Sequence, residues 1–311
     1  MEDQGPGGED REGVRMSHWL ALVLLALLAL WGCSGSSHIV HFNRGVSLQD
    51  KGHFREAAEE YKRATELNPE DPAPRFNLGV LYQDAGMLDL AEEVYRELLR
   101  MRPDYVRAWI NLAAIQEKRG EVGEAERSLR EAMRRDKDSP LASSHMGFFL
   151  LRLGRLEEAQ EAFSISLKKD PNWGNSHFGM GLIAQKRKEK EKALEHFKRA
   201  ASSNPMDAEA HLKVAELSLE LGDKEEAVRR LRRIASLDST NGANFLKLAR
   251  LLKEMGRWRE AQEAYERAFH LGAERGECLG ELREVYERLA EEKARAQRQL
   301  SAPRDERRPS P

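Results

Sequence analysis

The chain has 311 residues, and its 51 Lys and Arg nearly balance its 53 Asp and Glu, which argues against a dedicated nucleic-acid binder with a basic domain. Charged residues make up 33% of the chain and aromatic residues 7%, a composition typical of exposed helices and not of a β-sandwich or a disordered chain. Two cysteines, Cys33 and Cys278, are too few for a disulfide framework or a four-cysteine zinc site.

The first predicted element is an apolar run without a charge, WLALVLLALLALWGC, at residues 19–33. A bilayer-spanning helix needs about 20 apolar residues, so this run is short for one and has the length of a signal-peptide core. Arg11 and Arg15 precede the run, and by the positive-inside rule everything after it is exported. The acidic residues upstream are unusual for a signal peptide, and translation from Val14 or Met16 would remove most of them.

The end of this run resembles a bacterial lipobox, in which Cys33 would receive the lipid, although Trp31 departs from the small residue usual at its place. The resemblance implies a lipoprotein, and the alternatives are an uncleaved membrane anchor and a cleaved or spurious leader. Both the favoured lipoprotein and the anchor place the rest of the chain outside the cytoplasm, on the periplasmic side of the cell envelope. Residues 1–33 are then the signal or anchor segment, and residues 34–37 a Gly/Ser linker.

From residue 38 to residue 275 the chain repeats itself every 34 residues without an insertion. A small residue recurs at Gly45, Gly79, Ala113, Gly147, Gly181, Ala215 and Ala249. Twelve positions after each comes an alanine, at Ala57, Ala91, Ala125, Ala159, Ala193, Ala227 and Ala261. Four positions further comes a large apolar residue, at Tyr61, Tyr95, Leu129, Phe163, Phe197, Leu231 and Tyr265. This period and pattern resemble the tetratricopeptide repeat.

The resemblance implies an all-α fold, a right-handed α-solenoid of seven contiguous helix–turn–helix repeats, in which small residues let the paired helices approach closely. The repeats are expected at 38–71, 72–105, 106–139, 140–173, 174–207, 208–241 and 242–275. Glycines such as Gly52 and Gly154 suit a left-handed residue between the two helices, and Lys188 in the fifth repeat predicts an irregular turn there.

The last repeat needs a helix that covers its apolar face. A one-sided apolar stripe at helical spacing predicts a capping helix over residues 276–299, and it consists of Cys278, Leu279, Leu282, Val285, Tyr286 and Leu289. Cys278 is then a packing residue of the cap. The polar residues 300–311 are expected to form a disordered tail.

Sequence patterns of catalysis are missing from the chain, which has no phosphate-binding loop, no dinucleotide fingerprint, no HExxH and no GxSxG. His41, His177 and His211 share one repeat position, where packing explains them better than metal binding. We therefore expect no enzyme, no cofactor and no metal site.

The family resemblance implies that the first helix of each repeat lines a concave groove for an extended peptide or a partner helix. Asn43, Asn77 and Asn111 occupy one position of the first three repeats and resemble the asparagine ladder of some peptide-binding members. A side-chain amide offers a donor and an acceptor, so it can pair with a peptide bond of any sequence. The alternative is that asparagine is simply common at this position.

Apolar side chains accompany the asparagines and complete the predicted groove. They are Phe42, Phe76, Ile110 and Phe178 one position earlier, and Val46, Val80 and Phe148 one position after the small residue. Exposed apolar surface of this kind usually marks a partner site, and the alternative is that neighbouring helices cover part of it. In the last two repeats the position after the small residue is charged, with Glu216 and Arg250, whereas the position of Phe42 holds Leu212 and Leu246.

These features predict a non-enzymatic scaffold or adaptor at the bacterial cell envelope, attached to the membrane through a lipid or a helix. Its partner is a protein or a peptide bound in the groove, and no nucleic acid or small-molecule substrate is expected. One alternative is a regulatory subunit that presents substrates to a separate envelope protease or peptidoglycan hydrolase. Another is a cytoplasmic adaptor that resembles a co-chaperone.

Overall fold

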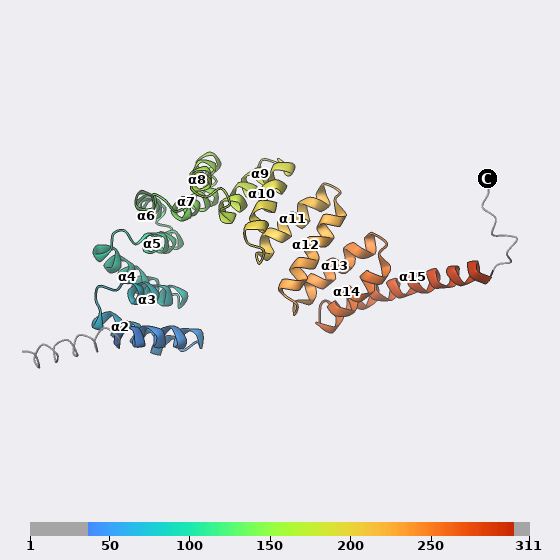
Figure 1. Cartoon of the computed structure of the whole chain (residues 1–311), viewed down its shortest axis with the longest axis horizontal. Coiled ribbons are helices and arrows are strands. Elements are labelled where there is room, and N and C mark those ends of the chain that lie inside the picture. The colour runs from blue at the N-terminus through green and yellow to red at the C-terminus, as the bar shows by residue number, and fades with distance from the viewer. Residues whose placement is uncertain (1–36, 302–311) are drawn as a thin grey trace, which may run out of the picture. The chain divides into compact units, whose positions relative to one another are not determined.

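The computed structural model of the chain describes residues 37–301, in which all regular structure is helical (Figure 1). The expected leader with Cys33, most of the expected linker and most of the expected tail lie outside these residues. Ser37, expected in the linker, is already helical. Within the described part of the chain, no helix is both long enough and apolar enough to cross a membrane.

The chain divides into two compact units, Met1–Lys137 and Asp138–Pro311. The described part of the first unit holds helical residues 37–50 and the helices α2 (Phe54–Leu67), α3 (Pro72–Asp84), α4 (Leu88–Met101), α5 (Val106–Lys118) and α6 (Val122–Arg135). The second unit holds α7 (Leu141–Arg152), α8 (Leu156–Lys169), α9 (Gly174–Lys186), α10 (Lys190–Ser203), α11 (Ala208–Glu220), α12 (Lys224–Leu237), α13 (Gly242–Glu254), α14 (Trp258–His270) and α15 (Arg275–Ser301).

Within each unit, helices that are consecutive in the chain pack as hairpins, and each hairpin packs on the next. In the first unit α3 packs on α4, α4 on α5 and α5 on α6, and the second unit continues in the same way from α7 to α15. The expectation of an all-α solenoid of helical hairpins is therefore confirmed.

Several helices begin at a side chain that caps their free backbone N–H groups. Asp71 Oδ1 accepts from the Ala73 N–H at 3.0 Å at the start of α3, where Pro72 occupies the first turn. Asp207 does the same for two N–H groups of α11. A carboxylate here satisfies backbone donors that have no partner inside the helix, so these residues fix where the helices start.

Where the recurring small residue is a glycine, an aromatic ring of the second helix lies directly on it. A Cβ atom at Gly79 would lie 2.5 Å from Tyr95 Cε1, and one at Gly147 would lie 2.5 Å from Phe163 Cε1. Such contacts are too close for carbon atoms, so a side chain at either glycine would force the ring or the helices to shift. The repeating glycine and ring positions thus set the distance between the helices of each hairpin.

The turn in the fifth repeat is regular, which corrects the sequence-based expectation. Lys188 has a φ of 61°, close to the 75° of Gly154 in the preceding repeat. Its N–H donates to the Gln185 carbonyl at 3.0 Å, just as the Gly154 N–H donates to the Leu151 carbonyl at 3.1 Å. The hydrogen bonds and helix packing around the turn impose the left-handed conformation on a residue that does not favour it.

Replacing Lys188 by glycine should therefore stabilise the protein. Glycine adopts a left-handed conformation without a steric penalty, so we expect the Lys188→Gly variant to gain about 1 kcal/mol in the free energy of unfolding. Urea unfolding followed by circular dichroism measures the change. The reverse change, Gly154→Lys, should lose a similar amount, and an unchanged unfolding midpoint in both variants would show that the turn carries no strain.

Helix α15 covers the apolar end of the second unit. It runs from Arg275 to Ser301, one residue before and two residues beyond the range expected for the cap. Cys278, Leu282 and Val285 are buried in a cluster with side chains of α13 and α14. Arg250 of α13 also bonds to Glu281 of α15, at 3.1 Å. The charge at this position of the last repeat thus helps to hold the cap in place.

Candidate functional site

The three asparagines lie at one register on the first helices of the hairpins in the first unit. Asn43 lies on helical residues 37–50, Asn77 on α3 and Asn111 on α5, and α3 contacts α5. The Asn43 side chain is exposed, whereas Asn77 and Asn111 are partly buried. We call the surface around these three residues the ladder face.

The apolar residues of the ladder face also pack on the second helices. The Phe42 ring lies 6.0 Å from the Tyr61 ring and the Phe76 ring 6.0 Å from the Tyr95 ring, measured between centroids. Phe42, Phe76, Val46 and Val80 are half-buried against the core clusters of the first unit. Ile110 is only 6% exposed, so it offers a ligand almost no area. The ladder face is therefore a polar row flanked by partly covered apolar side chains.

The second unit carries the remaining two predicted groove residues. Phe148 lies 5.0 Å from Phe163 and Phe178 lies 5.2 Å from Phe197, both with edge-to-face ring geometry. Both residues are half-buried. Edge-to-face pairs of this kind stabilise packing, so these two rings belong in part to the core of the second unit.

Tyr95, which sequence reasoning treated only as a packing residue, bonds to one of the asparagines. Asn111 Nδ2 donates to the Tyr95 hydroxyl at 2.9 Å, and that hydroxyl donates to Gln83 Oε1 at 3.3 Å. A tyrosine hydroxyl is protonated at physiological pH, and burial raises the pKa of Tyr95 further above its ordinary value. A sequence feature that could have indicated this bond is the 16-residue spacing from a tyrosine to an asparagine, which occurs from Tyr61 to Asn77 and from Tyr95 to Asn111.

Family models describe most of this architecture. One model of the tetratricopeptide repeat matches residues 42–104, 76–140, 150–201 and 178–241, and a second model of the same repeat matches residues 245–278. The chain belongs to the tetratricopeptide repeat family. Tetratricopeptide repeats are generally protein-interaction modules without catalytic activity, and they bind protein or peptide partners. A comparison with curated proteins found no match.

Solved structures share the tetratricopeptide repeat fold with this chain. That of pilF from Pseudomonas aeruginosa matches with a TM-score of 0.53 and 21% identity, covering 66% of this chain and 94% of that one. A tetratricopeptide repeat protein from Parabacteroides merdae matches with a TM-score of 0.51 and 17% identity, covering 81% of this chain and 99% of that one. The Cut9–Hcn1 hetero-tetramer of the APC/C matches with a TM-score of 0.53 and 16% identity, covering 78% of this chain and 48% of that one. At these identities the likeness concerns the fold.

The histidines of the tetratricopeptide repeats make structural contacts. His177 Nε2 lies 2.9 Å from the Pro171 carbonyl and His211 Nε2 lies 3.2 Å from the Pro205 carbonyl. A carbonyl only accepts, so each Nε2 carries a proton and donates it. Trp109 uses its Nε1–H in the same way, on the Pro103 carbonyl at 2.9 Å. This repeat position thus ties the first helix to the proline that closes the preceding repeat. Within residues 37–301, no cluster of three metal-ligating side chains occurs.

The buried histidines predict that acid weakens the second unit. Burial lowers the pKa of His196 and of His211 below the ordinary 6.5, and His177, whose Nδ1 lies 3.1 Å from His196 Nδ1, lowers that of His196 further. A depressed folded-state pKa means that the unfolded chain binds protons more readily, so stability falls as the pH drops below 6.5. We expect the thermal unfolding temperature to fall between about pH 7 and pH 5, and His211→Gln to reduce that fall. An equal fall in the variant would contradict the assignment to His211.

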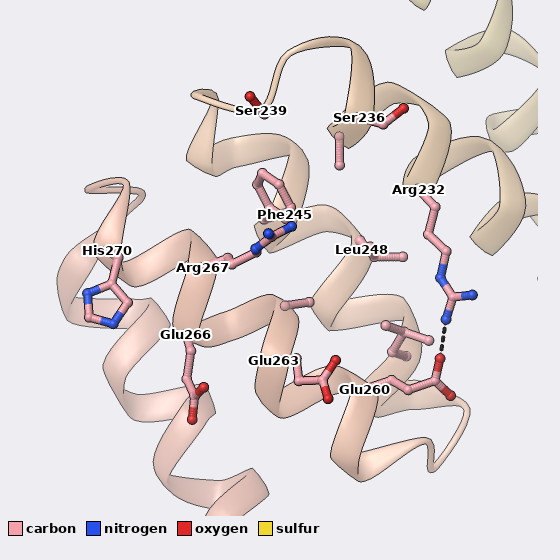
Figure 2. A pocket seen from close by; sticks show the side chains of 13 residues that line it. Arg232, Ser236, Ser239, Phe245, Leu248, Glu260, Glu263, Glu266, Arg267 and His270 are labelled. Carbon is pink, nitrogen blue, oxygen red and sulfur yellow. Dashed lines mark hydrogen bonds and ion pairs between the residues drawn. The ribbon is translucent and has the colours of Figure 1, made fainter.

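A pocket of about 690 Å³ opens between α12 and α14, over α13, on a surface that was not predicted from the sequence (Figure 2). The Arg267 guanidinium lies 5.3 Å from the centre of the Phe245 ring in the pocket, and Arg232 pairs with Glu260 at its edge. A pocket of about 420 Å³ lies at the equivalent place four repeats earlier, between α4 and α6, with Trp109 in the position of Phe245. Each pocket is lined by both acidic and basic side chains, and several of these form ion pairs with other residues of the chain.

Proposed function

We propose that this tetratricopeptide repeat protein is a non-enzymatic scaffold that holds an extended segment of a partner protein on the ladder face. The observation that carries the proposal is the row of three asparagines at one register on neighbouring first helices. Each amide offers a donor and an acceptor, and the backbone of an extended segment has free groups of both kinds. The half-buried Phe42 and Phe76 add apolar contact area beside the row.

We also propose that residues 1–33 attach the scaffold to the bacterial cell envelope, with the repeats outside the cytoplasm. Support comes from the sequence alone, from the apolar run and from Cys33 at its end. A lipid on Cys33 would concentrate the protein at the membrane and raise the effective concentration of any partner there.

The ladder proposal is tested by crosslinking capture from membranes with the full chain and with a variant in which Asn43, Asn77 and Asn111 are all alanine. We expect the variant to lose its main partners. The matched control replaces Asn172 and Asn175, two exposed asparagines of the second unit, by alanine. We expect this control to capture the same partners as the full chain. Circular dichroism checks that each variant folds. Unchanged capture by the ladder variant would refute the proposed site, and a captured protease or hydrolase whose activity changes would favour the regulatory alternative.

The envelope proposal is tested by labelling cells with a radioactive fatty acid and by adding protease to intact spheroplasts. We expect the label on the wild-type protein and not on the Cys33→Ser variant, together with cleavage of the repeats from outside. A protein that carries no fatty-acid label and resists protease until the cells are lysed would contradict the proposal and support the cytoplasmic adaptor.

A further inference from the structure

The rings of Tyr61 and Tyr95 are held so tightly that their hydroxyl groups have fixed positions. Both residues are fully buried. Each ring lies against a glycine of its own hairpin, where a Cβ atom at Gly45 or Gly79 would come within 2.7 Å or 2.5 Å of the ring. Phe42 and Phe76 pack against the same two rings. Because close-packed rings cannot shift without displacing their neighbours, each hydroxyl is presented at one place beside the ladder face.

The hydrogen bonds of these hydroxyls set the direction in which the neighbouring amides point. Tyr95 has a single hydroxyl hydrogen, which it donates to Gln83 Oε1, so the hydroxyl can only accept from its other neighbour. That neighbour is Asn111, whose Nδ2 donates to it at 2.9 Å. The Asn111 amide is therefore oriented with its nitrogen toward the tyrosine, which leaves Oδ1 and the second hydrogen of Nδ2 for other partners.

Part of this arrangement recurs one repeat earlier. The Tyr61 hydroxyl donates to Gln49 Oε1 at 2.8 Å, as the Tyr95 hydroxyl donates to Gln83, and Asn77 follows Tyr61 by sixteen residues, as Asn111 follows Tyr95. The hydrogen bond that orients an asparagine is the one between Asn111 and Tyr95.

Two of the three asparagines of the ladder follow a tyrosine by sixteen residues. The fourth repeat has Phe163 at the position of these tyrosines, and the residue sixteen positions later is Gly179. A Cβ atom at Gly179 would lie 2.1 Å from Phe163 Cζ. After Phe197 the equivalent residue is Lys213. Asn43 is the exception among the rungs, because the residue sixteen positions before it is Leu27, which has no hydroxyl, and the Asn43 side chain is exposed.

We propose that Tyr95 is a positioning residue of the ladder, which orients Asn111 so that this rung presents its acceptor Oδ1 and its free N–H to a bound segment in a fixed order. The inference rests on the proposed function. Because an extended backbone places its N–H and C=O groups in an order that reverses with chain direction, a rung of fixed orientation selects one direction of the bound chain. The ligand class is thus an extended protein segment recognised through its backbone in a single direction.

The test uses a pool of displayed random twelve-residue peptides that is enriched on the full chain in detergent, together with the reversed-sequence versions of the enriched peptides. We expect the Tyr95→Phe variant to bind the enriched peptides about tenfold more weakly, and an Asn77→Ala, Asn111→Ala variant to lose at least as much affinity. The reversed peptides should bind the wild-type chain at least as poorly. Tyr265→Phe is the matched control, because Tyr265 holds the same repeat position without an asparagine sixteen residues later.

A second measurement follows the amide itself, without a ligand. Hydrogen exchange of the Asn111 side-chain amide, observed by nuclear magnetic resonance, should be faster in Tyr95→Phe than in the wild-type chain, and unchanged in Tyr265→Phe. Equal exchange in all three proteins would overturn the inference. So would full peptide binding by the Tyr95→Phe variant when the asparagine variant has lost it, a result that leaves the proposed function standing. Peptide binding that survives in both variants, or a pool that does not enrich, would overturn the two together.

Discussion

Replacing Phe163 by alanine should lower the free energy of unfolding of the second unit by about 3–5 kcal/mol, one of the two largest effects that we expect from changes to single helices. The Phe163 side chain is 0% exposed and its ring lies between two glycines. A Cβ atom would come within 2.5 Å of the ring at Gly147 and within 2.1 Å at Gly179. Since neither glycine has a side chain that could fill the space, the cavity cannot collapse. Urea unfolding with hydrogen–deuterium exchange measures the loss and locates it.

The matched control for this change is Phe54→Ala, because Phe54 is 52% exposed and its removal leaves no cavity. We expect it to cost less than about 1 kcal/mol. Adding bulk on the opposite side of the ring, with Gly179→Ala, should cost about 1–3 kcal/mol, whereas Gly123→Ala, where a Cβ atom meets no neighbour, should be neutral or stabilising. Similar losses in Phe54→Ala and Phe163→Ala would refute the packing argument.

The second large effect is expected at the cap, where a Leu282→Ala, Val285→Ala double variant should lose about 4 kcal/mol. Both side chains are buried in one cluster with Tyr265, Ala249 and Leu252 of the preceding hairpin. In a solenoid the terminal hairpin has a neighbour on one side only, so weakening α15 exposes apolar surface of α13 and α14. Hydrogen–deuterium exchange in the double variant should be accelerated in α13 and α14 before it is accelerated in the other helices of the second unit.

Leu279 provides the control for the cap on the same helix. It is 55% exposed, so Leu279→Ala should change stability by less than about 0.5 kcal/mol. If Leu279→Ala were as destabilising as the double variant, the face of α15 that packs on the repeats would be assigned incorrectly. If neither variant changed stability, the repeats would not depend on the cap.

Much of the fold followed from contacts between residues that are close in sequence. Gly79 and Tyr95 are sixteen residues apart and touch within one hairpin, so a repeated glycine–aromatic spacing was enough to predict how the helices pair. The cap was predictable for the same reason, because Cys278, Leu282 and Val285 of the apolar stripe form the buried face of α15. Leu279 and Tyr286, which were expected in the same stripe, are exposed. The Lys188 turn was misjudged because residue preference was weighed without the hydrogen bonds that impose the conformation.

The candidate site was predictable only in part. Repeat register placed Asn43, Asn77 and Asn111 on equivalent positions of successive first helices, and the structure has them there. Exposure was not predictable, because Ile110 and Phe76 hold the same repeat position, yet Ile110 is buried and Phe76 is half-buried. How far a neighbouring hairpin covers a side chain depends on the sizes of the residues on both helices. The pockets beside Phe245 and Trp109 were missed for the same reason.

The sequence by itself determined the family, the repeat register and the all-α fold, because in a solenoid nearly every contact joins helices that are neighbours along the chain. The tertiary structure alone decided which asparagine is free and which is oriented by a tyrosine. That distinction depends on the direction of a hydrogen bond between two hairpins, in which the buried Tyr95 hydroxyl gives its one hydrogen to Gln83 and must accept from Asn111. Residue types and spacing do not encode that direction until the ring is fixed by packing.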